Sequence, residues 1–383
     1  MEPKKIGIVV MFKLNAGGGA PRVVVDLIKS LNEFGHSVYF LSPWKLDHKR
    51  IEEIYEPIPI EKEYNLDEKK KRFALGRNLS RIMIKNEFIT MASEVDMIID
   101  VDGGILDRYL PEDKKYVVWR ISAINPQKSP WEEKNWKLKI KEIIRKIIEK
   151  EEDHPSPNHK IYAVDDWTRE SLIKKWRLHP EKLCLYPEIK THQLSYNKKI
   201  KKNQAIILGR IVPNKWVDDS IKIFARGTEG TDYELKIVGG VSPDTEEYIE
   251  YLKKVAQDYG VVDKVAFVKN PSFELLKEHL EKSKVVIDSQ RDISLTMTAI
   301  ESLACGTVVL VHKNSGTFKE VLDNGKFGFG FETIAEGARK LKEIIHDLEK
   351  NKIDLKLFAK RAEFFSGKKF RERLKQILKA EGI

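Results

Sequence analysis

Two cations lie where the sequence passes from a buried strand to a helix. The apolar residues 205–208 predict a strand, Gly209, Arg210 and Lys215 follow it, and a helix is predicted over residues 218–225. Strands alternate with helices in this half of the chain, which predicts a parallel sheet whose ligands bind at the carboxyl ends of its strands. Arginine can bind two phosphate oxygens at once, and lysine adds a point charge. The pair therefore favours a phosphate-binding site over two solvated surface cations.

A second loop in the same half combines small and hydroxyl-bearing residues with the start of a helix. The loop residues are Ser294, Leu295, Thr296 and Met297, and a helix is predicted over residues 298–304. The first backbone N–H groups of a helix have no partner within it and attract anions. Glu301 lies inside this helix, where a carboxylate is costly to bury unless it is hydrogen-bonded. A ribose diol would satisfy it, and the alternative is a partly exposed acid of the helix.

The N-terminal half opens on a glycine-rich turn. Gly17, Gly18 and Gly19 separate the apolar run 6–12 from a helix predicted around residues 23–31. Glycine lets the backbone approach a ligand closely at the positive end of a helix, although a tight turn explains the run equally well. The spacing does not match G-x-G-x-x-G, so a dinucleotide reductase is not favoured.

Two carboxylates end a later strand of the first half. Asp100 and Asp102 could together bind Mg²⁺ or Mn²⁺. A match of this length is expected by chance in a chain of which 33% is charged. We therefore expect acids at a strand end, facing an acceptor, and no metal.

Alternating strands and helices predict two α/β domains. The polar and basic residues 196–203 can bury little, so they are expected to link the domains. We place the first Rossmann-like domain at residues 1–197 and the second at 204–355. A helical tail at residues 356–383 is expected to return to the first domain.

Charge and hydropathy exclude several classes of protein. The formal net charge is +10, but acidic residues are interleaved with the basic ones, so no nucleic-acid partner is expected. No apolar run is long enough to span a bilayer, and the chain enters its first strand without a signal sequence, which predicts a cytoplasmic protein. A basic helix predicted over residues 131–152 carries an isoleucine stripe. It packs on its own domain or, alternatively, lies peripherally on the inner face of the membrane.

Several motifs, in this order, resemble the retaining glycosyltransferases of family 4. Residues 17–24 resemble that family's G-G-A-E-R-V-V segment, with Pro21 where glutamate is usual. Residues 209–215 are similar to its GRLVPEKG, with Trp216 in place of the final glycine, and residues 301–306 are similar to EAMACG. Residues 116–118 and the basic helix resemble the subgroup that elongates lipid-linked oligosaccharides. The resemblance implies the GT-B fold, in which two Rossmann-like domains have parallel sheets that face each other across a cleft.

The resemblance also implies residue roles. Arg210 and Lys215 would bind the donor diphosphate and act in catalysis, and Glu301 would bind the ribose hydroxyls. The glycines 17–19 would approach the diphosphate from the first domain, and Asp102 and Arg120 would lie on the acceptor side. The remaining donor-binding residues would be Val268, Lys269 and Asn270 at the base, and Asp292, Ser294, Leu295, Thr296 and Met297 at the phosphates and sugar.

Two positions depart from the family pattern. The family has a second glutamate eight positions before the one that matches Glu301, and that position is Ile293 here. Asp292 is adjacent and could take its place. The histidine usual near the end of a first-domain strand is missing from residues 100–120. Both departures concern the sugar and the acceptor rather than the nucleotide.

The sequence therefore predicts a retaining hexosyltransferase that uses a UDP- or GDP-sugar and needs no metal or other cofactor. Its acceptor would be a glycan, a lipid-linked glycan or a small molecule with a free hydroxyl group. Two alternatives stay open: a non-catalytic nucleotide-sugar-binding protein with this fold, and a nucleotide-sugar epimerase.

Overall fold

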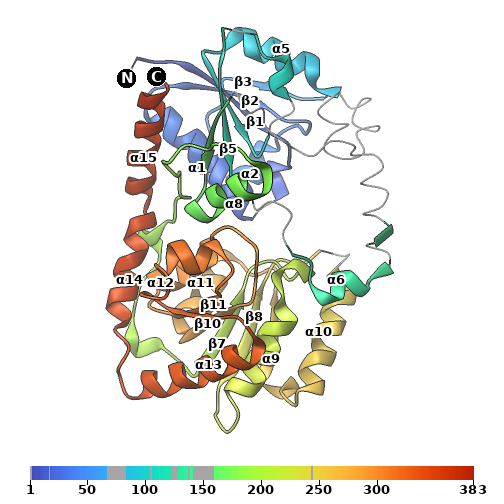
Figure 1. Cartoon of the computed structure of the whole chain (residues 1–383), viewed down its shortest axis with the longest axis vertical. Helices are drawn as coiled ribbons and strands as arrows, with labels where there is room; N and C mark the ends of the chain where they lie inside the picture. The colour runs from blue at the N-terminus through green and yellow to red at the C-terminus, as the bar shows by residue number, and fades with distance from the viewer. Residues whose placement is uncertain are drawn as a thin grey trace. The chain divides into compact units, whose positions relative to one another are not determined.

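The structure consists of two α/β units. The computed structural model describes residues 2–16, 18–66, 83–103, 106–111, 113–122, 127–136, 139–140, 159–242 and 245–383. The first unit comprises Met1–Ile124, Trp136–Glu188 and Phe370–Ile383, and the second comprises Asn125–Asn135 and Ile189–Lys369 (Figure 1). Each unit is therefore completed by a segment that is distant in sequence.

The first unit is built on a six-stranded parallel sheet in the order β3-β2-β1-β4-β5-β6. Its strands are β1 (Lys5–Val10), β2 (Ser37–Leu41), β3 (Lys62–Tyr64), β4 (Met97–Val101), β5 (Lys115–Arg120) and β6 (Lys160–Ala163). The central strands β1, β4 and β5 are buried almost throughout, as continuous apolar runs predict for a sheet covered on both faces. The strand order reverses between β1 and β4, where ligands of such sheets bind.

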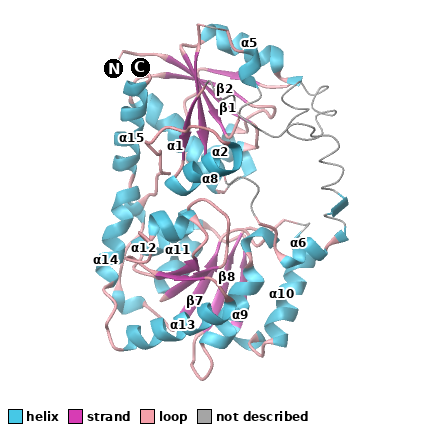
Figure 2. Ribbon diagram, viewed as in Figure 1, coloured by secondary structure: helices cyan, strands magenta, loops and turns pink. Residues whose placement is uncertain are grey.

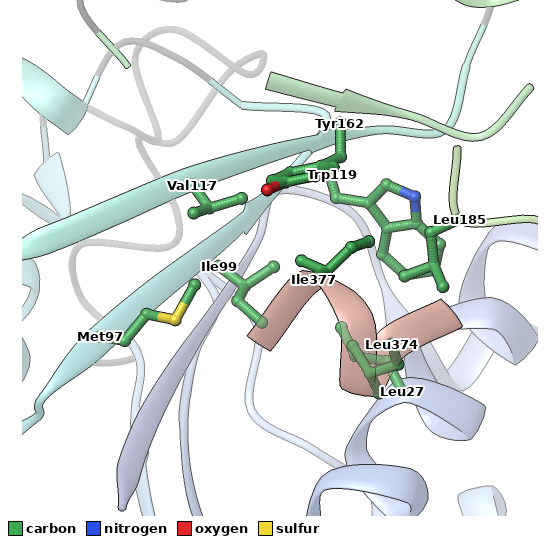
Figure 3. Close-up of a pocket in the computed structure, with 9 residues that line it drawn as sticks. All are labelled: Leu27, Met97, Ile99, Val117, Trp119, Tyr162, Leu185, Leu374 and Ile377. Atoms are coloured by element: carbon green, nitrogen blue, oxygen red, sulfur yellow. The ribbon is translucent and has the colours of Figure 1, made fainter. Parts of the chain in front are cut away.

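Helices surround this sheet (Figure 2). They are α1 (Gly19–Glu33), α2 (His48–Ile54), α5 (Lys85–Glu94), α8 (Asp166–Trp176) and α15 (Gly367–Ala380). Apolar side chains of α1, α15 and the strands β4 and β5 line a small void (Figure 3); they include Leu27, Ile99, Val117 and Leu374. All nine lining residues are hydrophobic or aromatic, so this void offers no cationic side chain to a phosphate.

The second unit repeats the same topology. Its six-stranded parallel sheet has the order β12-β11-β10-β7-β8-β9, which reverses between β7 and β10. The strands are β7 (Gln204–Leu208), β8 (Glu234–Gly239), β9 (Val265–Lys269), β10 (Val285–Asp288), β11 (Val308–His312) and β12 (Phe329–Phe331). The helices are α9 (Val217–Gly227), α10 (Glu246–Asp258), α11 (Phe273–Lys282), α12 (Met297–Ala304), α13 (Ile334–Glu349) and α14 (Leu355–Ala362). The predicted pair of Rossmann-like domains is thus confirmed.

The chain changes units earlier than the sequence predicts. The first domain is expected to end at residue 197 and the second to begin at 204, but the chain passes from the first unit to the second after Glu188. Ile189 donates its N–H to the carbonyl of Phe365, at 2.9 Å. The Lys201 ammonium donates to the carbonyl of Ser283 at 2.7 Å and to the hydroxyl of Thr307 at 2.8 Å. Polar composition suggested a linker, but these polar groups bind the second unit.

The C-terminal tail is shared between the units. Helix α14 packs on α12 of the second unit, whereas Phe370–Ile383 belongs to the first. There the Lys115 ammonium donates to the carbonyl of Glu381, at 2.6 Å. The Phe370 ring packs near Trp119, with 6.2 Å between the ring centroids.

The predicted basic helix over residues 131–152 is interrupted in its described part. Helix α6 (Pro130–Lys134) begins with a capping box between Ser129 and Glu132, and Asn135 is already extended. This helix belongs to the second unit, where Trp131 packs edge-on against Tyr248 with 5.2 Å between the ring centroids. Residues 137–138 and 141–152 lie outside the described residues. Among the helices described, none combines the length and apolar character needed to cross a bilayer.

Candidate functional site

The carboxyl ends of β7 and β8 approach each other closely through two glycines. Gly209 has φ +133°, and a Cβ at Gly239 would lie 1.6 Å from the Gly209 carbonyl oxygen. The N–H of Gly209 donates to Val238, at 3.0 Å, and the N–H of Ile211 donates to Gly240, at 2.9 Å. Glycine is required at Gly239 because a Cβ there would overlap the Gly209 carbonyl, and it is favoured at Gly209 because other residues rarely adopt so positive a φ. This contact fixes the backbone that carries Arg210.

Arg210 and Lys215 lie on the loop between β7 and α9, beside the point where the strand order of the sheet reverses. Arg210 is exposed and Lys215 is half-buried. The Lys215 side chain folds back over the loop, because its Cε lies 4.0 Å from the Cβ position of Gly209. Within the described part of the chain, neither cation makes a side-chain hydrogen bond or a direct ion pair with a protein group.

The electrostatics of Lys215 fit an anion site. Burial lowers the pKa of Lys215; the nearby Asp288 carboxylate opposes this effect and Arg210 adds to it. A half-buried cation that makes no direct ion pair costs free energy in the unliganded protein. A bound phosphate would supply the missing counter-charge.

The loop after β10 is tied to the segment that follows β11. Thr296 donates its N–H to the hydroxyl of Thr317 at 2.9 Å, and its own hydroxyl donates to Asp288 at 3.3 Å. Asp292 has φ +55°, and its N–H donates to the carbonyl of Asn314 at 2.7 Å. Ile293 forms an isolated parallel bridge with Ser315. The loop is therefore held through its backbone.

Helix α12 begins directly after this loop. Ser294, Leu295 and Thr296 are buried, and Thr296, at the N-cap, makes no side-chain hydrogen bond to the first turn. The N-terminal amides from Met297 onward are therefore not capped by the Thr296 side chain, and an anion is stabilised at such an end. Glu301 is half-buried within α12, and its role at the ribose stays a prediction.

The segment predicted to contact a base lies beside Arg210. Val268 and Lys269 end β9, and Lys269 is paired with Glu246 at 3.0 Å. Asn270 has φ +48°, and its side-chain oxygen accepts the N–H of Val241 at 2.9 Å. A Cβ at Gly240 would lie 3.8 Å from Cγ of Arg210 and 3.9 Å from Oδ1 of Asn270. The Gly239–Gly240 pair, which connects the two segments, was missed, although two glycines at a strand end could have signalled it.

The site residues predicted in the first unit are glycines at the start of α1 and two buried, hydrogen-bonded side chains. Gly18, with φ +104°, precedes α1 and is exposed, and Gly19 is the first residue of that helix; Gly17 lies outside the described residues. Asp102 is buried and accepts the N–H groups of Ile121 at 2.8 Å and Ser122 at 3.0 Å. Arg120 is also buried and donates to the carbonyl of Asp102 at 3.1 Å.

Asp100 and Asp102 are engaged within the first unit. The Tyr116 hydroxyl donates to the Asp100 carboxylate, and the Asp102 carboxylate lies 3.7 Å from Nε of Arg120. No cluster of three or more His, Cys, Asp or Glu side chains suited to a metal occurs among the residues that the structure describes. The predicted roles of Asp102 and Arg120 toward an acceptor stay predictions.

A cluster that the sequence did not predict lies next to the loop of Arg210 and Lys215. Trp216 is 4% exposed and has φ +52°, a left-handed conformation that is rare for a bulky residue. The guanidinium carbon of Arg291 lies 3.7 Å from the centroid of the Trp216 ring, and Arg291 donates to Asp219. These contacts join residues 75 and 72 positions apart, and no local pattern reveals such pairings.

Comparisons with known proteins agree with this architecture. Residues 188–363 match the family model of glycosyl transferases group 1. A mouse (Mus musculus) protein named GDP-Man:Man(3)GlcNAc(2)-PP-Dol alpha-1,2-mannosyltransferase is 24% identical over 168 residues. That match covers 41% of this chain and 34% of the mouse protein, so it spans about a third of that relative's length.

Two solved structures resemble nearly the whole chain. A glycosyltransferase from Rickettsia africae has a TM-score of 0.72 at 14% identity and covers 99% of both chains. The Alr3699/HepE protein of Anabaena, solved with UDP and glucose, has a TM-score of 0.69 at 14% identity and covers 98% of this chain and 100% of its own. The chain therefore has the fold of the GT-B glycosyltransferases, and its residues 188–363 match the model of the glycosyl transferases of group 1.

Proposed function

We propose that this chain is a retaining glycosyltransferase that moves a hexose from a nucleoside-diphosphate sugar to a hydroxyl acceptor without a metal ion. One observation carries the proposal: among the described residues, Arg210 and the half-buried Lys215 lie at the reversal point of the second sheet and make no direct ion pair with an acidic side chain. The uncapped start of α12 adds backbone amides that favour the same negative charge.

The proposed chemistry uses these groups to stabilise the leaving nucleoside diphosphate. As the bond from sugar to phosphate breaks, negative charge grows on the diphosphate, and Arg210, Lys215 and the α12 amides would hold it in place of a metal. One preorganised contact of this kind typically lowers a barrier by about 2–4 kcal/mol. The acceptor hydroxyl would attack from the face that the diphosphate leaves and pass its proton to a phosphate oxygen.

The donor base is proposed to lie against Val268, Lys269 and Asn270, with the ribose at Glu301. UDP and GDP are both candidates: the mouse relative's name specifies GDP-mannose, and the Anabaena structure contains UDP. We propose a glycan or lipid-linked acceptor, supported by the lipid-linked oligosaccharide in the mouse relative's name. Peripheral contact with the inner face of a membrane stays a prediction.

A thermal-unfolding screen tests the donor assignment. A ligand that binds only the folded state raises the apparent stability, by about 2.7 kcal/mol at 100 times its Kd. We expect UDP or GDP, with the matching sugar nucleotides, to raise the Tm of the full chain in EDTA, and ADP to raise it less. If no nucleotide raises the Tm, the proposed donor site is wrong.

Metal independence has its own test. Transfer with the nucleotide sugar found by the screen should proceed equally in EDTA and in Mg²⁺ or Mn²⁺. Complete loss of transfer in EDTA, restored by added metal, would refute the proposal that cationic side chains and helix amides replace a metal.

A nucleotide-sugar-binding protein without transferase activity is the second candidate, favoured by Ile293. This residue stands where the resemblance places a sugar-binding carboxylate, and it is held in a bridge to Ser315. Such a protein would bind the nucleotide sugar and turn over no acceptor. An epimerase would convert the nucleotide sugar in the absence of any acceptor. Chromatography of the donor incubated with and without mixed glycan acceptors separates the three outcomes.

A further inference from the structure

We propose that Trp216 and Arg291 are positioning residues that hold Lys215 in place for the donor diphosphate. This inference rests on the proposed function and concerns two residues that are not predicted to contact the donor. Trp216 directly follows Lys215 and ends the short 3-10 turn Pro213–Lys215 that carries it. The orientation of the Trp216 ring therefore sets the direction in which the chain presents Lys215.

The Trp216 ring is fixed from the loop after β10. The Arg291 guanidinium stacks on it at 3.7 Å and also donates to Asp219, in the first turn of α9. A second contact joins the same two segments, because the hydroxyl of Ser220 donates to that of Ser289 at 2.8 Å. The two loops at the reversal point of the sheet are thus held together by an arginine stack, an ion pair and a hydrogen bond.

The charges of this cluster balance without the phosphate-binding cations. Asp218 and Asp219 each lie 3.0 Å from the ammonium of Lys222, and Asp219 also pairs with Arg291. Two cations therefore meet two carboxylates. Arg210 and Lys215 are left outside this balance, so the cluster can orient them without competing with an anion for their charge.

The conformation of Trp216 supports a positioning role. A left-handed backbone costs a bulky L-residue free energy, whereas glycine adopts it readily. Strain of this kind persists where surrounding contacts over-determine a residue and is common at functional sites. Here the surrounding contact is the arginine stack, so Trp216→Gly removes the ring and leaves the backbone conformation accessible.

A double-mutant cycle tests the inference on the full chain in EDTA. Isothermal titration calorimetry would give the Kd of UDP and GDP for the wild type, W216G, R291M and W216F. We expect W216G and R291M each to weaken binding of the nucleotide that the wild type binds by about tenfold, and W216F to remain within about twofold of the wild type. In R291M, Asp219 keeps Lys222 as its partner, so the substitution leaves no unpaired buried carboxylate.

The cycle separates positioning from general stability. In a K215M background, W216G should weaken binding by less than about twofold, because the ring acts through Lys215. R226M is the matched control: Arg226 stacks on Tyr259 at 5.5 Å near the other end of α9, and its loss should leave the Kd unchanged. Thermal unfolding without ligand would verify that each variant is folded at the titration temperature.

Three results would overturn the inference. The first is that W216G and R291M bind the nucleotide with the Kd of the wild type. The second is that W216G raises the Kd by the same factor in the wild-type and K215M backgrounds. If the wild type itself binds neither UDP nor GDP, the proposed function and this inference both fail.

Discussion

Replacing Lys215 by methionine should weaken nucleotide binding without lowering the stability of the unliganded protein. Methionine keeps the length of the side chain and removes a half-buried ammonium whose pKa burial lowers. A hydrogen bond to a charged group contributes about 1.5–3 kcal/mol net, and tenfold in Kd corresponds to about 1.4 kcal/mol. We therefore expect the Kd of the nucleoside diphosphate to rise by about 10- to 150-fold. The free energy of unfolding should stay the same or rise, because the half-buried ammonium that is removed makes no direct ion pair in the folded protein.

Two measurements on the same preparations decide this prediction. Calorimetric titration with UDP or GDP gives the Kd, and urea unfolding without ligand gives the free energy of unfolding. K253M is the control, because Lys253 lies on α10 with about half of its side chain exposed and pairs with Glu250. The reasoning is refuted if K215M lowers the free energy of unfolding and leaves the Kd unchanged, since Lys215 would then be a structural residue.

Three further predictions concern the same loop and the first unit. Nucleotide affinity should fall as pH rises through the lowered pKa of Lys215, because the free protein loses its charge there; K215R should hold its affinity to higher pH in the same titration. In Gly239→Ala, the new Cβ would lie 1.6 Å from the Gly209 oxygen. The free energy of unfolding measured in urea should therefore fall by at least about 2 kcal/mol, and calorimetry should show that nucleotide binding is lost. Leu374→Ala enlarges the void of the first unit and should cost about 2–5 kcal/mol in urea unfolding, while the nucleotide Kd measured well below the Tm stays unchanged.

The folding stability of the unliganded protein should also change with pH as Lys215 titrates. Because the pKa of Lys215 is lower in the folded protein than in the unfolded chain, the unfolded chain binds more protons as pH rises through the folded value. The contribution of Lys215 to folding stability therefore increases with pH. Its contribution to diphosphate binding decreases over the same range. If folding stability rises with pH while nucleotide affinity falls, a global effect of pH on the protein does not explain both changes.

The two parallel sheets were predictable because each central strand is a continuous apolar run, whereas the order of their strands was not predicted. Strands such as β7 and β11 are buried along their whole length, and the helices between them show amphipathic spacing. The boundaries between the units were less predictable. Residues 196–203 are polar, which suggested a linker, but the Lys201 ammonium finds acceptors at Ser283 and Thr307. Composition alone does not reveal whether a polar group has a partner.

The site was predictable only where its residues are close in sequence. Arg210 and Lys215 share one loop with Gly209, and a glycine followed by cations after a strand is a local signal. Trp216 and Arg291 form their stack across two loops, so neither residue stood out. Position 216 carried one usable sign, a tryptophan where the resembling family has glycine. A bulky residue at a position that favours glycine indicates that a compensating contact lies nearby.

The location of a bound nucleotide is the most direct test of this account. A crystal structure of the full chain, soaked in EDTA with UDP or GDP, would show it. We predict diphosphate oxygens within hydrogen-bonding distance of Arg210 and Lys215, at the carboxyl end of β7 and the start of α12. A nucleotide bound elsewhere, with both cations left in solvent, would contradict the central claim.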